Sequence, residues 1–452
     1  MQNNTIIAQA TPIGPGAIAL IRLSGKDAVD IAAQAVQLPG KTSLESKSSH
    51  TISFGAILDS SGRKIDQVLL LLMRGPQSFT GEDIVEITCH NNQLIVNAII
   101  TRCIELGARP AERGEFTRRA VENNKLSLLQ AEAIQELISA QSVPSLQKSL
   151  AQLEGSLSKW LQCLETKLLT ARALCEASFE FLEEEYNPNT ELSHILEEII
   201  ATIEQAQEQF SAQKQLREGI RIALIGSTNA GKSSLLNALF KQNRAIVTPI
   251  AGTTRDTIEA TVYKNGIAWT LIDTAGLRST QDPIETAGIE RTYQEAQKAD
   301  LILLLIDGLP ENNYDLAEYE ALLKKYSEKC IVVQTKSDKQ AQQSSSLAPA
   351  VFISSKDRRG LDKLENKIAQ HLQVMLTKTA LPFTLNQRHI QILTQIKTIA
   401  ESIQKDLLAE TQSYELISLK LQDVLQACTH MSGQEHSTQL LDAVFAQFCV
   451  GK

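Results

Sequence analysis

The sequence has no cysteine pair in a CxxC arrangement, no long apolar run and no excess of positive charge. Its seven cysteines are scattered over 452 residues, which indicates reduced thiols rather than a disulfide framework. The longest apolar runs, at 68–73 and 301–306, are far shorter than the roughly 18 residues of a membrane span. A formal net charge of −8 argues against a protein that coats nucleic acid through its overall charge. A local basic patch is still compatible with this net charge.

The first residues, MQNNTIIAQATPIGPG, have no basic leader followed by an apolar segment. We therefore predict no secretory signal and expect a soluble, cytoplasmic protein without a membrane anchor. The length allows two to four domains of roughly 100–200 residues each. A hydrophobic content of 43% is ample for their cores.

The composition changes three times along the chain. Residues 1–120 mix short β-like runs with helical stretches, which predicts a small α+β domain. Residues 121–215 hold almost no glycine or proline, and their apolar residues recur every three or four positions, as in long amphipathic helices. In 216–379 strands alternate with helices, which is typical of a doubly wound sheet. Residues 380–452 are helical again, so we expect an α/β domain inserted into a split helical domain.

The inserted domain contains a phosphate-binding motif. Residues 226–233 read GSTNAGKS, which matches GxxxxGK[ST] between a predicted strand and a predicted helix. Backbone N–H groups of such a loop wrap the β-phosphate, its lysine reaches the β and γ oxygens, and its serine binds Mg²⁺. A chance glycine-rich turn is the alternative. The residues assigned to the nucleotide here are Asn229, Ala230, Gly231, Lys232, Ser233 and Ser234.

Two downstream motifs argue against chance. DTAG at 273–276 ends a predicted strand, so Asp273 suits the Mg²⁺ shell and the Gly276 N–H suits the γ-phosphate, with Thr274 and Ala275 between them. In GTTRD at 252–256, Thr254 is the second hydroxyl expected on Mg²⁺. The order and spacing of these motifs predict a GTPase with a pair of switch segments.

The base is predicted to be read by TKSD at 335–338. Asp338 would accept hydrogen bonds from guanine N1–H and the N2 amine, which adenine lacks there, while the stem of Lys336 lies along the ring. Thr335 stands where most GTPases have asparagine, so one tethering amide is shortened to a hydroxyl. A backbone donor to guanine O6 would come from Ser354, Ser355 and Lys356, for which a charged loop is the alternative.

Hydrolysis needs a group that orients water, and Leu277, which follows the DTAG motif, cannot do so. Glu285 is the nearest promising carboxylate, with a helix-capping glutamate as the alternative. Asn229 could complete a cage for a monovalent cation that replaces an arginine finger. The other cage ligands would be carbonyl groups of the segment Thr248, Pro249, Ile250, Ala251, Gly252 and Thr253.

These residues resemble the MnmE (TrmE) family of tRNA modification GTPases over essentially the whole chain. The motifs that carry the resemblance are NAGKSSLLNALF, IAGTTRD, DTAGLR, the terminal FCVGK, TIIAQATPIGPGAIALIRLSG, SFTGEDIVEI at 78–87 and GEFTRRAVENNKLSLLQAEAI at 114–134. The resemblance implies a tetrahydrofolate-binding dimerisation domain at 1–120, helical segments at 121–215 and 380–452, and a Ras-like P-loop G domain at 216–379.

The resemblance also implies ligands and partners. Mg²⁺ would be bound by Ser233 and Thr254, and Glu285 would orient the water. Dimerisation of two K⁺-bound G domains would activate hydrolysis. A MnmG-type FAD protein would cooperate in placing a carboxymethylaminomethyl or aminomethyl group on C5 of the wobble uridine, with 5-formyl- or methylene-tetrahydrofolate as one-carbon donor. The implied K⁺ ligands are Asn229, Thr248, Ile250 and Thr253, and the implied folate ligands are Arg22, Glu82, Lys125 and Lys452.

Three places depart from the family pattern. His90-Asn91-Asn92 stands where a histidine and two glycines are usual, and Arg113 stands where proline is usual. Near the end, HMSGQEH at 430–436 replaces a more usual apolar-Thr-Gly run. Ordinary surface charge is the alternative reading of the folate residues.

Cys449 is the fourth residue from the end, in FCVGK. A C-terminal lipidation signal is weakly supported, because lysine is a poor last residue for it. A redox role is also weakly supported, because no resolving cysteine is near in the sequence. A flexible tail that brings Cys449 to the folate pocket as nucleophile or acid–base group is favoured. The alternative is that Cys449 is a buried thiol that only packs in a core.

Three other classes of protein are alternatives to this interpretation. A ribosome-assembly GTPase would share the G-domain motifs but would add a basic RNA-binding module. A membrane-remodelling GTPase would show a lipid-binding patch, and a scaffold would not need an intact nucleotide site. Arginines cluster at 102, 109, 113, 118 and 119, either as a tRNA or partner face or as a solvated helix face interleaved with glutamates.

Overall fold

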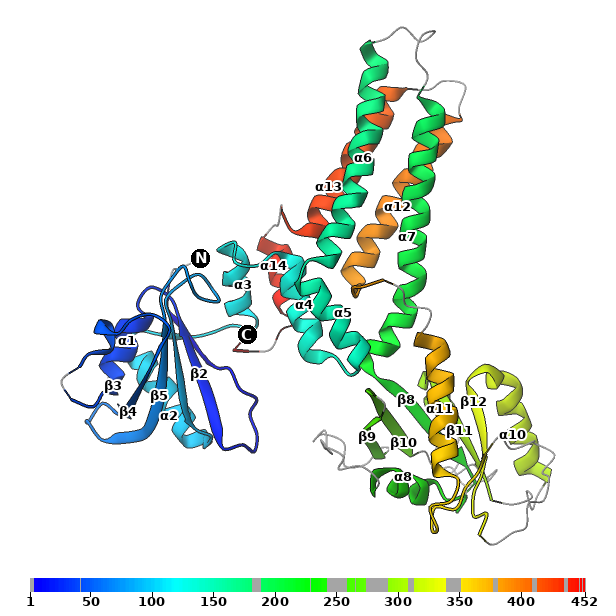
Figure 1. The fold of residues 1–452 in the computed structure, drawn as a ribbon, viewed down its shortest axis with the longest axis horizontal. Coiled ribbons are helices and arrows are strands. Elements are labelled where there is room, and N and C mark those ends of the chain that lie inside the picture. Colours follow the sequence, from blue (N-terminus) through cyan, green and yellow to red (C-terminus); the bar gives the residue numbers. More distant parts are fainter. Residues whose placement is uncertain are drawn as a thin grey trace. The chain divides into compact units, whose positions relative to one another are not determined.

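Figure 1 shows the fold of the chain in a computed structural model. The structure describes residues 4–40, 42–180, 188–227, 229–241, 258–264, 266–273, 292–307, 313–338, 351–376, 381–408, 413–434, 438–446, 448 and 450–451. Contacts divide the chain into two compact units. The first comprises Met1–Gln135, Gln152–Leu196 and Thr398–Lys452, and the second comprises Glu136–Ala151 and Glu197–Lys397.

A seven-stranded sheet forms the N-terminal part of the first unit, in the order β3-β4-β5-β6-β2-β1-β7. Its neighbouring strands are antiparallel except for the parallel pair β1 and β7. The short β-like runs that indicated an α+β domain correspond to β2, β5 and β6. The strands are β1 (Ile6–Gln9), β2 (Ile18–Ser24), β3 (Val36–Gln37), β4 (Thr51–Leu58), β5 (Lys64–Met73), β6 (Ile84–His90) and β7 (Arg109–Pro110).

The two faces of this sheet differ. Helices α1 (Ala28–Ala35) and α2 (Gln93–Glu105) pack on one face and bury the main core of the domain (Figure 1). The other face carries exposed apolar side chains, and Phe54 on β4 lies directly opposite Leu69 on β5. Exposed apolar residues on an antiparallel sheet, where one face is usually polar, indicate a surface for a partner. They are Ile18 (63% exposed), Ile52 (68%), Phe54 (51%) and Leu69 (46%).

Long helices complete the first unit. The 25-residue helix α6 (Ser156–Glu180) packs along α13 (Tyr414–Ser432) (Figure 1). Gly433 ends α13 with φ 74°, and a Cβ there would lie 2.5 Å from the Leu128 Cβ. Glycine at this position therefore lets α13 end close to α4. The other helices here are α3 (Glu115–Glu122), α4 (Leu128–Ser139) and α14 (Thr438–Phe445).

In the second unit, the helix before the α/β domain pairs with the helix after it. Helix α7 (Asn189–Glu218) has 30 residues, and α12 (Gln387–Leu407) lies beside it. The Gln207 amide donates to the Thr394 hydroxyl at 2.8 Å, and Lys397 forms a 2.7 Å ion pair with Glu204. The predicted long helices are confirmed, and contacts join helices from both sides of the inserted domain. A shorter helix, α5 (Val143–Leu153), precedes them.

The second unit also contains a six-stranded sheet in the order β13-β12-β11-β8-β10-β9. All neighbours are parallel except β9, which forms a hairpin with β10 in which Lys264 lies opposite Ile267. The predicted doubly wound sheet is therefore confirmed, and β9 is its antiparallel strand. Its strands are β8 (Ile220–Gly226), β9 (Ile258–Lys264), β10 (Ile267–Asp273), β11 (Leu301–Ile306), β12 (Cys330–Gln334) and β13 (Val351–Phe352).

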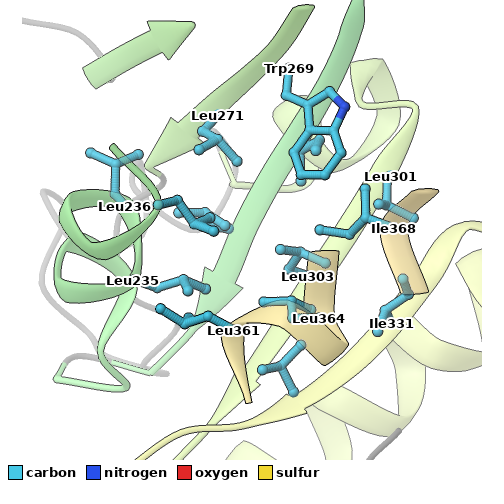
Figure 2. Packing of buried hydrophobic residues seen from close by; sticks show 14 of the residues in the cluster. Leu235, Leu236, Trp269, Leu271, Leu301, Leu303, Ile331, Leu361, Leu364 and Ile368 are labelled. Atoms are coloured by element: carbon cyan, nitrogen blue, oxygen red, sulfur yellow. The ribbon is translucent and has the colours of Figure 1, made fainter. Parts of the chain in front are cut away.

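Helices cover both faces of this sheet. Residues of α8 (Lys232–Lys241) and α11 (Leu361–Leu376) pack on one face around the fully buried Trp269 (Figure 2). Residues of α10 (Asn313–Tyr326) pack on the other face. Every residue of β11 is buried. A central strand covered on both sides needs a continuous apolar sequence, which explains the run LILLLI.

Among the described residues, Cys89, Cys103, Cys163, Cys175, Cys330 and Cys428 are free thiols. None of the helices that the structure describes combines the length and apolar character needed to cross a membrane.

Candidate functional site

The phosphate-binding loop joins β8 to α8. Strand β8 ends at Gly226 and α8 begins at Lys232, so the loop lies at a helix N-terminus, where N–H groups favour an anion. Asn229 and Gly231 have φ angles of 68° and 92°. A Cβ at Gly226 would lie 2.5 Å from the carbonyl oxygen of Leu305. The glycines of the motif thus permit both the tight turn and its close approach to β11.

Polar side chains meet at this loop. The Lys232 side chain is largely buried, and its Nζ donates to the carbonyl oxygens of Gly226 and Ser227 at 2.9 and 3.0 Å. Burial lowers the pKa of Lys232, and the charge of Asp273 partly opposes this shift. The Ser233 hydroxyl donates to Asp273 Oδ2 at 2.7 Å. A hydroxyl beside a carboxylate offers the oxygen ligands that Mg²⁺ prefers, so the residues present fit this ion.

The neighbouring strands explain why Asp273 reaches Ser233. Strands β8 and β10 are parallel, and Asp273 lies opposite Leu224 in their register. Both strands therefore end at the same edge of the sheet, where ligands bind in doubly wound folds. Residues far apart in the sequence converge there because of this topology.

Thr335 tethers the base-recognition segment to the phosphate-binding loop. Its buried hydroxyl donates to the carbonyl oxygen of Ala230 at 2.7 Å. The hydroxyl that stands where most GTPases have a longer amide therefore still reaches the loop. The Ser227 N–H also donates to the hydroxyl oxygen of Tyr319 on α10 at 2.8 Å. No sequence motif points to Tyr319, because it lies 92 residues from Ser227 in the sequence.

Asp338 lies beside Ser354, as expected for a base site built by two segments. The Ser354 hydroxyl donates to Asp338 Oδ1 at 2.9 Å and holds the carboxylate in place. The backbone N–H of Ser354 already donates to the Arg359 carbonyl oxygen at 3.0 Å. A backbone donor for the base would therefore come from Ser355 or Lys356.

The remaining described nucleotide residues are placed as follows. Lys336 has φ 54°, and its ammonium forms an ion pair with Asp307, which directly follows β11. Sequence motifs gave no signal for Asp307. Ala230 is buried, and Ser234 is exposed in the first turn of α8.

Some predicted site residues lie outside the described residues. They are Thr248, Pro249, Ile250, Ala251, Gly252, Thr253, Thr254, Thr274, Ala275, Gly276, Glu285, Cys449 and Lys452.

In the first unit, Glu82 is the centre of a polar cluster. It accepts hydrogen bonds from Ser24 Oγ at 2.7 Å and from the Arg119 guanidinium at 2.9 Å. Ser24 also shares a 2.7 Å hydrogen bond with Thr80, and both residues are buried. Lys125 is close, because a Cβ at Gly81 would lie 3.3 Å from its Cγ. Glu82 and Lys125 are therefore brought together.

Arg22 lies two residues before Ser24 on β2, on the same face of the strand. Its guanidinium forms an ion pair with Glu86 at 2.7 Å. It also lies over the rings of Phe79 and Phe116, at 5.8 and 5.6 Å from their centroids. All three described residues of the predicted folate pocket thus come from neighbouring segments of one domain.

The asparagines that replace glycines after β6 have structural roles. The Asn91 side chain donates to the Gly14 carbonyl oxygen at 2.7 Å and so fastens the loop before β2. Asn92 caps α2, because its side chain accepts from the Leu94 N–H at 2.9 Å. His90 pairs with Asp66 at 2.9 Å.

The arginine cluster is mostly engaged in ion pairs, which makes a free basic face for nucleic acid less favoured. The side chains of Arg118 and Arg119 are only 7% and 10% exposed. Arg113 is exposed, and its backbone forms a bridge with Val450. The ion pairs are Arg102–Glu105, Arg109–Glu115, Arg118–Glu122, Arg118–Asp442, Arg119–Glu82 and Arg119–Glu115.

The mostly parallel sheet, the phosphate-binding loop and the Ser233–Asp273 pair place the second unit among P-loop proteins with a GTP-binding G domain. The model of the GTP-binding protein TrmE N-terminus matches residues 5–125, and that of the MnmE helical domain matches residues 128–449. The chain belongs to the MnmE family of tRNA modification GTPases.

Individual relatives match almost end to end. The tRNA modification GTPase MnmE of Geobacillus kaustophilus is 39% identical, covering 99% of this chain and 99% of that protein. The MnmE of Aquifex aeolicus is 37% identical with the same coverage. Among solved structures, the G domain of the T. maritima FeoB iron transporter is 28% identical, covering 34% of this chain and 98% of that chain, with a TM-score of 0.26.

Proposed function

We propose that this protein hydrolyses GTP in order to modify tRNA. With a MnmG-type flavoprotein that carries FAD, it attaches a carboxymethylaminomethyl or aminomethyl group to C5 of the wobble uridine. The observation that carries the proposal is the Ser233–Asp273 pair beside Lys232, in a chain of the MnmE family. The reaction would take place in the cytoplasm, where tRNA and GTP meet.

In the proposed hydrolysis, N–H groups at the start of α8 hold the β-phosphate and Lys232 contacts the β and γ oxygens. Ser233 and Thr254 would bind Mg²⁺, which neutralises charge on these oxygens, with Asp273 fixing the Ser233 hydroxyl. The Gly276 N–H would meet the γ-phosphate. Glu285 would orient the attacking water, the role that glutamine has in Ras-like proteins.

We propose that Asn229 in the phosphate-binding loop is one ligand of a K⁺ ion. Carbonyl groups of Thr248, Ile250 and Thr253 would complete the cage. The ion would supply the positive charge that an arginine finger supplies elsewhere. Dimerisation of two G domains would close this cage and activate hydrolysis.

For the one-carbon unit, we propose that the N-terminal domain binds 5-formyl- or methylene-tetrahydrofolate. The Glu82 carboxylate accepts from Ser24 and Arg119, yet two carboxylate oxygens have about four acceptor sites. Acceptor capacity therefore remains for the N–H donors of a pterin ring. Lys125 and Lys452 would suit the carboxylates at the other end of the folate, and Arg22 would border the pocket.

A homodimer fits the exposed face of the seven-stranded sheet. Four large apolar side chains there are each about half exposed or more, on β2, β4 and β5. A second copy of the same face would remove them from water in a two-fold contact. We propose this face, which carries Ile18, Ile52, Phe54 and Leu69, as the dimer contact of the N-terminal domain.

The base preference gives one test. Asp338→Asn should lose the preference for guanine, because an amide presents a donor where guanine N1–H and N2–H also donate. We expect GDP affinity to fall about 100-fold or more. Xanthosine diphosphate, which has a hydrogen-bond acceptor at C2, should bind the variant more tightly than it binds wild type. Fluorescence titration with GDP, xanthosine diphosphate and ADP measures this. Comparable ADP binding by the wild-type protein would contradict the assigned base site.

The tRNA reaction gives a second test. In a strain lacking the gene, a plasmid copy with Cys449→Ser should leave the wobble uridine unmodified, because the proposed nucleophile or acid–base group is lost. Purified Cys449→Ser protein should keep K⁺-stimulated GTP hydrolysis within about twofold of wild type. Mass spectrometry of tRNA nucleosides is the measurement. Normal modification by this variant would reduce Cys449 to a packing residue.

A further inference from the structure

The end of the chain is anchored to the N-terminal domain at several points. Val450 forms an antiparallel backbone bridge with Arg113. Just before it, the rings of Phe445 and Phe448 lie 4.9 Å apart. A Cβ at Gly114 would lie 2.9 Å from both the Phe445 carbonyl oxygen and the Phe448 Cβ. Glycine at 114 therefore lets α3 and the end of α14 touch.

Gly451 makes the tightest of these contacts. Its φ is 90°, which L side chains rarely adopt. A Cβ there would lie 2.2 Å from the Gln9 carbonyl oxygen and 3.0 Å from the Ala10 Cα. These obstacles are backbone atoms at the end of β1, so they cannot rotate away as a side chain would. Both the conformation and the space at position 451 require glycine.

The same residue touches the predicted folate pocket. The Arg22 guanidinium approaches the Gly451 carbonyl oxygen at 3.5 Å. Arg22 is itself held by Glu86 and lies over the Phe79 and Phe116 rings. Contacts within the N-terminal domain therefore hold the guanidinium in place, and it offers a donor to the backbone at Gly451.

We propose that Gly451 is a positioning residue for the one-carbon site. It locks the end of the chain against β1 and Arg22, so that residues 450–451 form a wall of the pocket. Cys449 and Lys452, the residues proposed to act in the pocket, flank this anchor in the sequence. The role in one-carbon transfer rests on the proposed function, whereas the lock itself is a separate structural claim.

The test compares Gly451→Ala with Gly62→Ala in the full-length protein. Gly62 is a matched control, because its φ is 81° and a Cβ there would meet no atom within 4 Å. Release of Lys452 by a carboxypeptidase reports the lock directly. We expect release from Gly451→Ala to be about tenfold faster than from wild type, since an undocked end is open to the protease. Gly62→Ala should match wild type.

Function is then measured on the same proteins. Misplacing the tail should lower wobble-uridine modification by Gly451→Ala about 100-fold. GTP hydrolysis and the thermal unfolding temperature should stay at wild-type values. Unchanged protease release would overturn the lock, and fast release with full modification would overturn its positioning role. If wild-type protein also failed to modify tRNA, the proposed function would fail while the protease result still decided the lock.

Discussion

Lys232→Ala should lower kcat/KM for GTP by about 100-fold or more, because removing one preorganised donor to a reacting group typically costs that much. The ammonium is buried and already directed at the phosphate-binding loop, where it donates to the Gly226 and Ser227 carbonyls. No other described lysine or arginine side chain donates to these carbonyls. Steady-state phosphate release with GTP is the measurement.

Lys298→Ala is the control for the loss of a positive charge. Lys298 belongs to the same unit, is 62% exposed and pairs with Glu295 at 3.2 Å. Exposed pairs contribute little, so this variant should hydrolyse GTP at the wild-type rate. A Lys232→Ala protein that retains more than about a tenth of wild-type activity would contradict the assigned role of the lysine.

GTP hydrolysis should be at least about tenfold faster in K⁺ than in Na⁺ at equal ionic strength, because the proposed ion would replace an arginine finger worth considerably more than that. Na⁺ is too small to contact every oxygen of a cage built for K⁺. Hydrolysis rates in the two chloride salts, at saturating GTP and Mg²⁺, measure the difference. Equal rates would rule out the cage.

The choice of variant matters at Asn229. Its φ is 68°, so alanine would add backbone strain to the loss of the amide, whereas glycine adopts this conformation freely. Asn229→Gly should therefore remove the K⁺ stimulation while the loop keeps its shape. Stimulation that survives in Asn229→Gly would assign the cation to other ligands.

Features of the G domain that depend on neighbouring residues could be predicted from the sequence. A fully buried strand at 301–306 and a phosphate-binding loop before α8 follow from side-chain size, periodicity and glycine content over a few positions. The split helical segments were predictable for the same reason. Their 3.6-residue periodicity is local.

Partners of the site residues could not be predicted in this way. The partner of the Thr335 hydroxyl is the carbonyl oxygen of Ala230, which lies 105 residues away in the sequence. The arginines at 118 and 119 resembled a basic face, but carboxylates from other segments pair with them. Each of these contacts depends on where the fold places a distant segment.

The sequence by itself determined the type of each domain and the chemistry of the nucleotide site, because both are written in contiguous motifs. Only the tertiary structure decided which charges are paired, that Asp273 meets Ser233 at one sheet edge, and that Gly451 packs against the backbone of Gln9 beside Arg22. The physical reason is that hydrogen bonds, ion pairs and van der Waals exclusion act over a few ångströms of space. They depend on the packed fold and are independent of separation along the chain.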